Sequence, residues 1–239
     1  MGNPDNFADG AGRTHPKGGN IMGTMYLGGF LVPILIGLIL MIFTFVFERF
    51  ISLKKAQGKK DLDTFLKQAD KHLVDGNIDA VIDLCNQQKG SVANIVRGGS
   101  ERFRDIRNSA DMTNTQKVAE VKRALEEVTM LETPLLERNL VILSTIASIS
   151  TMIGLLGTVF GMIRSFRALG EGGAGASATQ LSVGISEALW NTALGIGGGI
   201  LAIIFYNVLT NKVDKFIYTI DEATLTLVES LENRLMGKA

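Results

Sequence analysis

The sequence has few of the residues that build catalytic and metal centres. Its 239 residues include one cysteine, Cys85, and two histidines, His15 and His72. A single cysteine excludes an internal disulfide and cannot supply the ligand cluster of a zinc site. The chain also has no Walker loop or dinucleotide fingerprint, and the run from Gly184 to Ala188 lacks the second glycine of a nucleophile elbow. We therefore expect no enzyme, no bound metal and no cofactor.

Charged residues are absent from two long stretches and nearly absent from a third. Residues 21–47 and 139–163 contain no Asp, Glu, Lys or Arg, and residues 172–211 contain only Glu187. Each stretch is longer than the roughly 20 helical residues that cross about 30 Å of hydrocarbon. The predicted transmembrane helices are residues 28–47, 139–163 and 181–208.

The distribution of cations predicts the orientation. Of the 24 Lys and Arg residues, 16 lie in residues 48–138, whereas residues 1–27 and 164–180 hold two each. Cytoplasmic segments beside a span are enriched in cations. We therefore expect residues 48–138 and 209–239 in the cytoplasm, and residues 1–27 and 164–180 as a tail and a loop on the opposite side. The start of the chain lacks the pattern of a cleavable signal, so the first helix is expected to remain.

The cytoplasmic parts show helical periodicity. In residues 61–107 apolar side chains recur at helical spacing and predict short amphipathic helices, punctuated at Gly76, at Gly90 and at the Gly98-Gly99 pair. Apolar residues of the tail predict that the third span continues as a helix into residues 209–239. These seams suit packing within one bundle and contacts between subunits equally well.

A helical pattern resumes at Thr115 and runs into the second span, with Pro134 as its one expected kink. Together the patterns predict an all-α membrane protein with three transmembrane helices, of which the second and third continue into a cytoplasmic helical bundle.

Hydroxyl groups gather on one side of the second predicted span. At 100° per residue, six side chains lie within about 40° of one line along this helix. They are Ser144, Ser148, Thr151, Leu155, Thr158 and Met162. Such hydroxyls can satisfy their own backbone or join two helices. The other interpretation is a face that lines a narrow pore. Gly157 and Gly161 form a helix-packing GxxxG step beside it.

The third span combines a stripe of small residues with one acid. The stripe consists of Gly184, Ala188, Thr192, Gly195 and Gly199. It lets another helix backbone approach closely. Glu187 costs at least a few kcal/mol at this depth unless it is paired, hydrated or protonated, so it is a candidate ion-pathway residue or a structural acid between helices. It lies about 140° from Thr192 around the helix, so the two side chains cannot face one neighbour squarely.

Two motifs carry a family resemblance. The run from Gly154 to Ile163 is similar to the GLLGTVxGxI signature of ExbB and TolQ, and the run from Gly184 to Leu189 followed by Thr192 is similar to their GIxEAL(x)xT signature. Their order and separation also fit. The three spans resemble ExbB or TolQ more than the four-span MotA. The chain is thus identified as a member of the MotA/TolQ/ExbB proton-channel family, most similar to ExbB.

The resemblance implies a function that the residue patterns alone do not give. Members form a pentamer in the bacterial inner membrane, with an ExbD-like or TolR-like single-span partner inside a central pore. Protons driven by the membrane potential titrate an aspartate of that partner, and the work passes to a TonB-like or TolA-like protein. By position, Thr158 and Thr192 would be pore hydroxyls facing this aspartate, and Glu187 the buried acid near the pore and the subunit boundary.

Departures from the family pattern leave alternatives open. Thr151 stands where proline is frequent, and its added hydroxyl predicts extra hydration in the pore. Ser148 and Leu155 are expected to line the pore on the same face. Trp190 replaces a smaller aliphatic residue. A TolQ-like envelope motor, transport of Na⁺ in place of H⁺, and a structural scaffold that conducts nothing remain alternatives. An intramembrane hydrolase has no visible pair of nucleophile and base.

Overall fold

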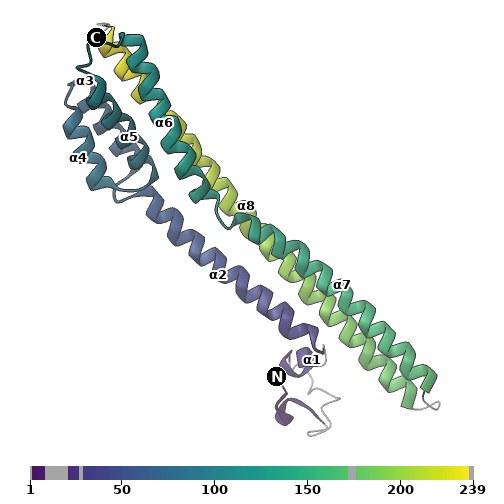
Figure 1. Ribbon diagram of the computed structural model, residues 1–239. Coiled ribbons are helices and arrows are strands. Elements are labelled where there is room, and N and C mark those ends of the chain that lie inside the picture. The colour runs from purple at the N-terminus through teal and green to yellow at the C-terminus, as the bar shows by residue number, and fades with distance from the viewer. Residues whose placement is uncertain (1, 9–20, 27–28, 172–175, 237–239) are drawn as a thin grey trace. The chain divides into compact units, whose positions relative to one another are not determined.

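The computed structural model describes residues 2–8, 21–26, 29–171 and 176–236, and within these ranges the regular structure is helical. A 3-10 turn covers Pro4–Asn6, and the α-helices follow along the chain (Figure 1). They are α1 (Ile21–Tyr26), α2 (Leu31–Gln57), α3 (Leu62–Val74), α4 (Ile78–Gln88), α5 (Ser91–Ile106), α6 (Asn114–Glu137), α7 (Leu140–Glu171) and α8 (Ala176–Leu235). Most of the predicted N-terminal tail and the tip of the predicted outer loop lie outside the described residues.

The chain divides into two compact units. The first unit consists of residues 1–46 and 140–207, and the second of residues 47–139 and 208–239. Helices α2 and α8 contribute residues to both units. Among the described residues, three helical stretches are long and apolar enough to cross a membrane: they lie within Leu31–Val74, Asn114–Gly170 and Leu181–Leu235. The all-α membrane fold with three spanning helices is thereby confirmed.

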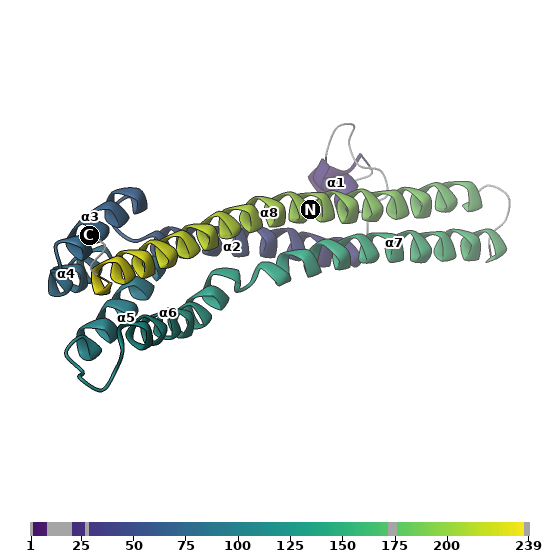
Figure 2. The same cartoon turned by 90° about the horizontal axis from the view of Figure 1, so that it is seen from above.

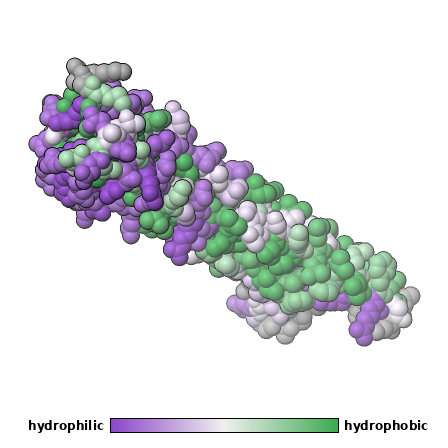
Figure 3. Space-filling view, turned by 45° about the horizontal axis from the view of Figure 1, so that its top comes forward, coloured by the Kyte–Doolittle hydropathy of each residue, from purple (hydrophilic) through white to green (hydrophobic). Residues whose placement is uncertain are grey.

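The first unit has a narrow buried seam and an apolar outer surface. Figures 1 and 2 both show α7 and α8 side by side and antiparallel. Leu35 and Ile42 of α2, Leu143 of α7 and Ala202 of α8 are fully buried. Many large apolar side chains remain exposed, and green covers much of the visible face of this unit in Figure 3. A surface of this kind suits hydrocarbon and not water.

The second unit is an amphipathic helical bundle. Helices α3 to α6 pack in sequence, each on the next, around buried residues such as Phe65 and Leu125, and Leu227 of α8 is also buried. The visible surface over α3 to α5 is largely purple in Figure 3. Thr113 and Gln116 form a reciprocal capping box at the start of α6. This unit therefore has the polar exterior and apolar core of a water-exposed domain.

Glycines in the second unit act in two ways. Gly90 caps the start of α5 with φ +92°, and a Cβ there would overlap the carbonyl oxygen of Ala56. The prediction of a punctuation at Gly98-Gly99 is wrong, because both residues lie inside α5. A Cβ at Gly99 would lie 2.6 Å from Cδ2 of Leu125. These glycines bring α5 close to α6.

The prediction of one helix running from Thr115 into the second span, kinked only at Pro134, is also wrong. Pro134 lies within α6, and the helix stops at Glu137. Asn139 then takes φ +64°, a left-handed conformation that Asn tolerates better than most residues. Its side-chain amide donates to Oε2 of Glu48 at 3.3 Å. The turn at residues 138–139 therefore separates α6 from α7.

Candidate functional site

Small residues let the backbones of α7 and α8 touch. Gly154 and Gly195 are both buried and face each other. A Cβ built on Gly195 would lie 2.5 Å from the Cα of Gly154 and 2.7 Å from the carbonyl oxygen of Ser150, closer than real Cβ contacts. Ser150 Oγ donates to the carbonyl oxygen of Gly195 at 3.1 Å, and Thr192 Oγ1 donates to that of Gly154 at 3.2 Å. These bonds join the helices where hydrocarbon offers no competing water.

The remaining small residues extend the same seam. Gly161 faces Gly184 and Ala188, while Gly199 faces Thr151 and Ala147. Gly157 faces Asn191, whose amide nitrogen donates to the carbonyl oxygen of Glu187 at 3.1 Å. The structure thus brings together all six residues predicted for helix packing: Gly157, Gly161, Gly184, Ala188, Gly195 and Gly199. It uses them for a contact within one chain.

Most of the hydroxyl line lies on a different side of α7, and Thr151 stands at the border of the seam, where its hydroxyl meets Gly199. Ser148 and Leu155 are exposed, and Thr151 and Thr158 are half-buried. The hydroxyls of this line donate to carbonyl oxygens of their own helix: Ser148 to Ser144 at 3.3 Å, Thr151 to Ala147 at 3.1 Å and Thr158 to Leu155 at 2.5 Å. Among the described residues of the first unit, no other element covers this face fully. It therefore remains accessible to lipid, water or another chain.

A shallow hollow opens beside Thr158. It has a volume of about 550 Å³ and is lined by Thr158, Val159, Met162, Ile163 and Phe166. All five come from successive turns of α7, and only the threonine brings a polar group. The hollow can accept an apolar helix that carries one polar side chain at this level.

Glu187 is buried and paired. Its side chain is 8% exposed, and Arg164 Nη1 of α7 donates to its Oε2 at 2.6 Å. Arg164 is 57% exposed and so reaches solvent or headgroups with the rest of its side chain. A Cβ at Gly29, where φ is +72°, would overlap Oε1 of Glu187. The left-handed backbone and the close carboxylate both favour glycine at this position just before α2.

The structure separates the two polar residues of α8. Thr192 points to the backbone of α7, whereas Glu187 points to Arg164 and Gly29. This agrees with the expected angle of about 140° between them. Thr158 lies on the accessible face of α7, while the Thr192 hydroxyl is engaged at the seam. The two threonines thus have different surroundings within one chain.

Sequence reasoning missed Arg164 as the partner of Glu187. The sequence contained a signal for this partner. When a short loop joins two antiparallel helices, the residues that face each other have numbers with a nearly constant sum. Gly154 with Gly195 and Gly161 with Ala188 both sum to 349, and Arg164 with Glu187 sums to 351. The buried polar residues Ser150, Ser165 and Asn191 were also missed.

Other chemistry is sparse in the described part of the chain. No group of three His, Cys, Asp or Glu side chains that could hold a metal ion occurs among the described residues. Cys85 is buried, and burial raises the pKa of its thiol from 9.0 to about 12. Such a thiol is a packing group and not a nucleophile at neutral pH. His15 lies outside the described residues.

The fold and the paired helices define a class: a multi-pass membrane protein whose second and third spanning helices pack through small residues beside an intramembrane acid. The model of the MotA/TolQ/ExbB proton channel family matches residues 89–222, which is more than half of the chain. This protein belongs to that family. The family and the apolar helices point to a multi-pass protein of the bacterial inner membrane.

Relatives with ExbB and TolQ names are similar to this chain. An ExbB-like biopolymer transport protein of Synechocystis is 38% identical over 44% of this chain and 50% of its own length. The Tol-Pal system protein TolQ of Pseudomonas aeruginosa is 34% identical over 53% and 54%. The biopolymer transport protein ExbB of Aquifex aeolicus is 35% identical over 48% and 69%. The chain spans about half the length of the first two relatives.

Proposed function

We propose that this chain is a proton-channel subunit of an ExbB-like motor that couples the proton motive force to a TonB-like protein for active transport across the outer membrane. The observation that supports the proposal is that two faces of α7 have different surroundings. One face is used up by packing on α8, while Ser148, Leu155 and Thr158 stay at least partly exposed within the chain; Thr151 of the same line borders Gly199 of α8. A ring of subunits would turn this second face inward.

The chemistry of the uncovered face supports a pore. In the proposed assembly, five copies surround the spanning helix of an ExbD-like or TolR-like partner, and the hollow beside Thr158 receives it. A partner aspartate at this level would accept a hydrogen bond from Thr158 Oγ1, which now bonds within its own helix at 2.5 Å. Thr192 lies on the neighbouring helix and would shape the pore from the seam. The transported ion in this proposal is H⁺, and no cofactor takes part.

Glu187 has a separate role in the proposal. An acid at this depth is expensive unless it is paired, and Arg164 supplies the pair here. The pair lies near the outer end of α7, where it would stand at the subunit boundary close to the pore. A proton moving through that region would compete with Arg164 for the carboxylate. The charge distribution along the chain supports a periplasmic N-terminus and a cytoplasmic C-terminus.

The experiment is potential-driven proton uptake in vesicles. The chain is purified with an ExbD-like partner, reconstituted with a pH-sensitive dye inside, and energised with a potassium gradient and valinomycin. Thr158→Val removes the pore hydroxyl and keeps the shape. Thr145→Val is the matched control, because Thr145 is an exposed hydroxyl on another side of α7 that also bonds to a carbonyl of its own helix.

We expect uptake by the parent complex, full uptake by the control, and uptake at the level of empty vesicles for Thr158→Val and Glu187→Gln. Equal uptake by all variants would overturn the proposal and leave a structural scaffold, for which the α7–α8 seam alone would suffice. If uptake requires Na⁺ and disappears in choline buffer, the transported ion is Na⁺ and not H⁺. Assembly with a TolR-like partner in preference to an ExbD-like one would favour a TolQ-like motor.

A further inference from the structure

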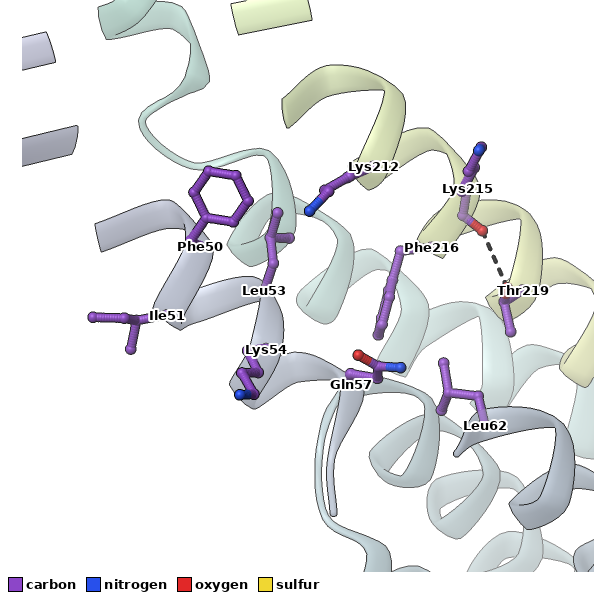
Figure 4. Close-up of a pocket in the computed structure, with 10 residues that line it drawn as sticks. All are labelled: Phe50, Ile51, Leu53, Lys54, Gln57, Leu62, Lys212, Lys215, Phe216 and Thr219. Atoms are coloured by element: carbon purple, nitrogen blue, oxygen red, sulfur yellow. Dashed lines mark hydrogen bonds between the residues drawn. The ribbon is translucent and has the colours of Figure 1, made fainter. Parts of the chain in front are cut away.

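The second unit contains a cavity that the proposed function does not use. It has a volume of about 580 Å³ and lies among α2, the start of α3 and the cytoplasmic part of α8 (Figure 4). Its lining consists of Phe50, Ile51, Leu53, Lys54, Gln57, Leu62, Lys212, Lys215, Phe216 and Thr219. The cavity is therefore formed where two long helices leave their apolar segments.

The lining combines hydrocarbon with positive charge. Three of its residues are lysines and none is acidic. Among the described residues, no carboxylate forms an ion pair with Lys54, Lys212 or Lys215. The ammonium group of Lys212 lies 4.4 Å from the centroid of the Phe50 ring. A ligand of this cavity must therefore bring negative charge and apolar surface together.

The side chains in Figure 4 show how such a ligand would lie. Lys212 reaches from α8 toward Phe50 and Leu53, and the Phe216 ring lies over the middle of the cavity. The Lys215 ammonium is turned away, while Thr219 Oγ1 donates to its backbone oxygen at 3.1 Å. Lysine side chains are long and flexible, so the ammonium groups at the rim can turn toward an anion.

The position of the cavity along the chain matches the membrane surface. The uncharged run of the first span ends at Phe47, and that of the third span ends at Asn211. Phe50 and Lys212 follow within three residues, which is about 5 Å along a helix. The cavity thus lies at headgroup level, on the side that carries the cation-rich segment. Anionic lipids gather at such polybasic sites.

We propose that this cavity binds an anionic glycerophospholipid such as phosphatidylglycerol. Its phosphate lies against Lys212, with Lys215 and Lys54 at the rim. Its acyl chains run along Phe50, Ile51 and Phe216. Free phosphate would leave the aromatic lining unused, and an acidic peptide would have to bury polar backbone against it. The proposal is independent of ion conduction, so it can fail while the proposed function stands.

The first test uses native mass spectrometry on the whole purified protein. The wild type in mild detergent is mixed with equal amounts of phosphatidylglycerol and phosphatidylethanolamine that carry the same acyl chains. We expect retained adducts of phosphatidylglycerol, and a loss of about fivefold in their abundance for each lysine removed in Lys212→Gln and Lys212→Gln/Lys215→Gln. Lys71→Gln/Lys122→Gln is the control, because both lysines are exposed in the same unit and line no part of the cavity.

Equal retention of the two lipids by the wild type would overturn the proposal, even if a variant failed to fold. Equal losses in the cavity variant and in the control variant would also overturn it. A second test locates the lipid on the wild type with a phosphatidylglycerol that carries a photoreactive acyl chain. Cross-links to residues 50–57 and 212–219 support the site, and cross-links confined to other helices contradict it.

Discussion

Removing Arg164 should expose the cost of the buried carboxylate that it pairs. The bond to Glu187 is short, 2.6 Å, and the acid is 8% exposed, whereas Arg164 is 57% exposed. A unit charge pair at contact distance gains about 4 kcal/mol at an effective dielectric of 20, and partial exposure reduces that gain. We therefore expect a coupling free energy of about 2 kcal/mol between the two side chains.

The two single variants should differ in a predictable order. Arg164→Gln leaves a buried carboxylate unpaired and should cost about 2 to 3 kcal/mol of unfolding free energy. Glu187→Gln should cost only about 1 kcal/mol, because the freed guanidinium can turn outward. The double variant should cost about as much as Glu187→Gln alone, since neither charge is then left without its partner.

The assay is a double-mutant cycle in mixed micelles. Trp190 is the only tryptophan of the chain and lies one turn from Glu187 on α8, so its fluorescence reports unfolding of this region as SDS is added. The groups are not coupled if the cost of the double variant equals the sum of the two single costs to within about 0.5 kcal/mol. That result would contradict a stabilising pair of Arg164 and Glu187.

Three further predictions follow from the described contacts. Gly195→Val should destabilise the protein by about 1 to 3 kcal/mol in the same assay, whereas Gly197→Val, which meets nothing within 4 Å, should cost clearly less; equal costs would contradict the seam. The hydrogen bond from Arg49 lowers the pKa of Glu48 below 4.5 in the folded protein. The stability that Glu48 adds relative to Glu48→Gln should therefore be complete above pH 4.5 and be lost as the pH falls through the pKa of the folded state. Thermal unfolding at several pH values measures this difference, and a constant difference down to about pH 2 would argue against it. Cys85, with its pKa of about 12, should react with iodoacetamide at pH 8 at least about a hundredfold more slowly in the folded protein than in SDS, and comparable rates would contradict its burial.

The long elements could be predicted because their signals are strong. Long stretches with no charged residue, or with Glu187 alone, indicate the spanning parts of α2, α7 and α8, since about 20 consecutive apolar residues suit a helix that crosses hydrocarbon. The small-residue stripe on the third span likewise indicates which face meets a helix. Periodicity also indicated helices in residues 61–107, where α3, α4 and α5 are found.

The missed features depend on contacts between distant residues. Gly98 and Gly99 look like helix breakers in isolation, but packing of α5 on α6 requires small residues at that point. The break at Asn139 is accompanied by a hydrogen bond to Glu48, 91 residues away. The Arg164 partner of Glu187 emerges only once the register of α7 on α8 is known. Local propensity carries none of this information.

The most direct test of the account is the mass of the detergent-solubilised complex after co-expression with an ExbD-like protein, measured by native mass spectrometry. We expect five copies of this chain with the partner bound. In Thr158→Trp the bulky ring should fill the hollow on α7, so that the five copies persist and the partner is lost, while Thr145→Trp keeps it. A monomer or dimer, or a partner that stays bound in both variants, would contradict a pore built on the Thr158 face of α7.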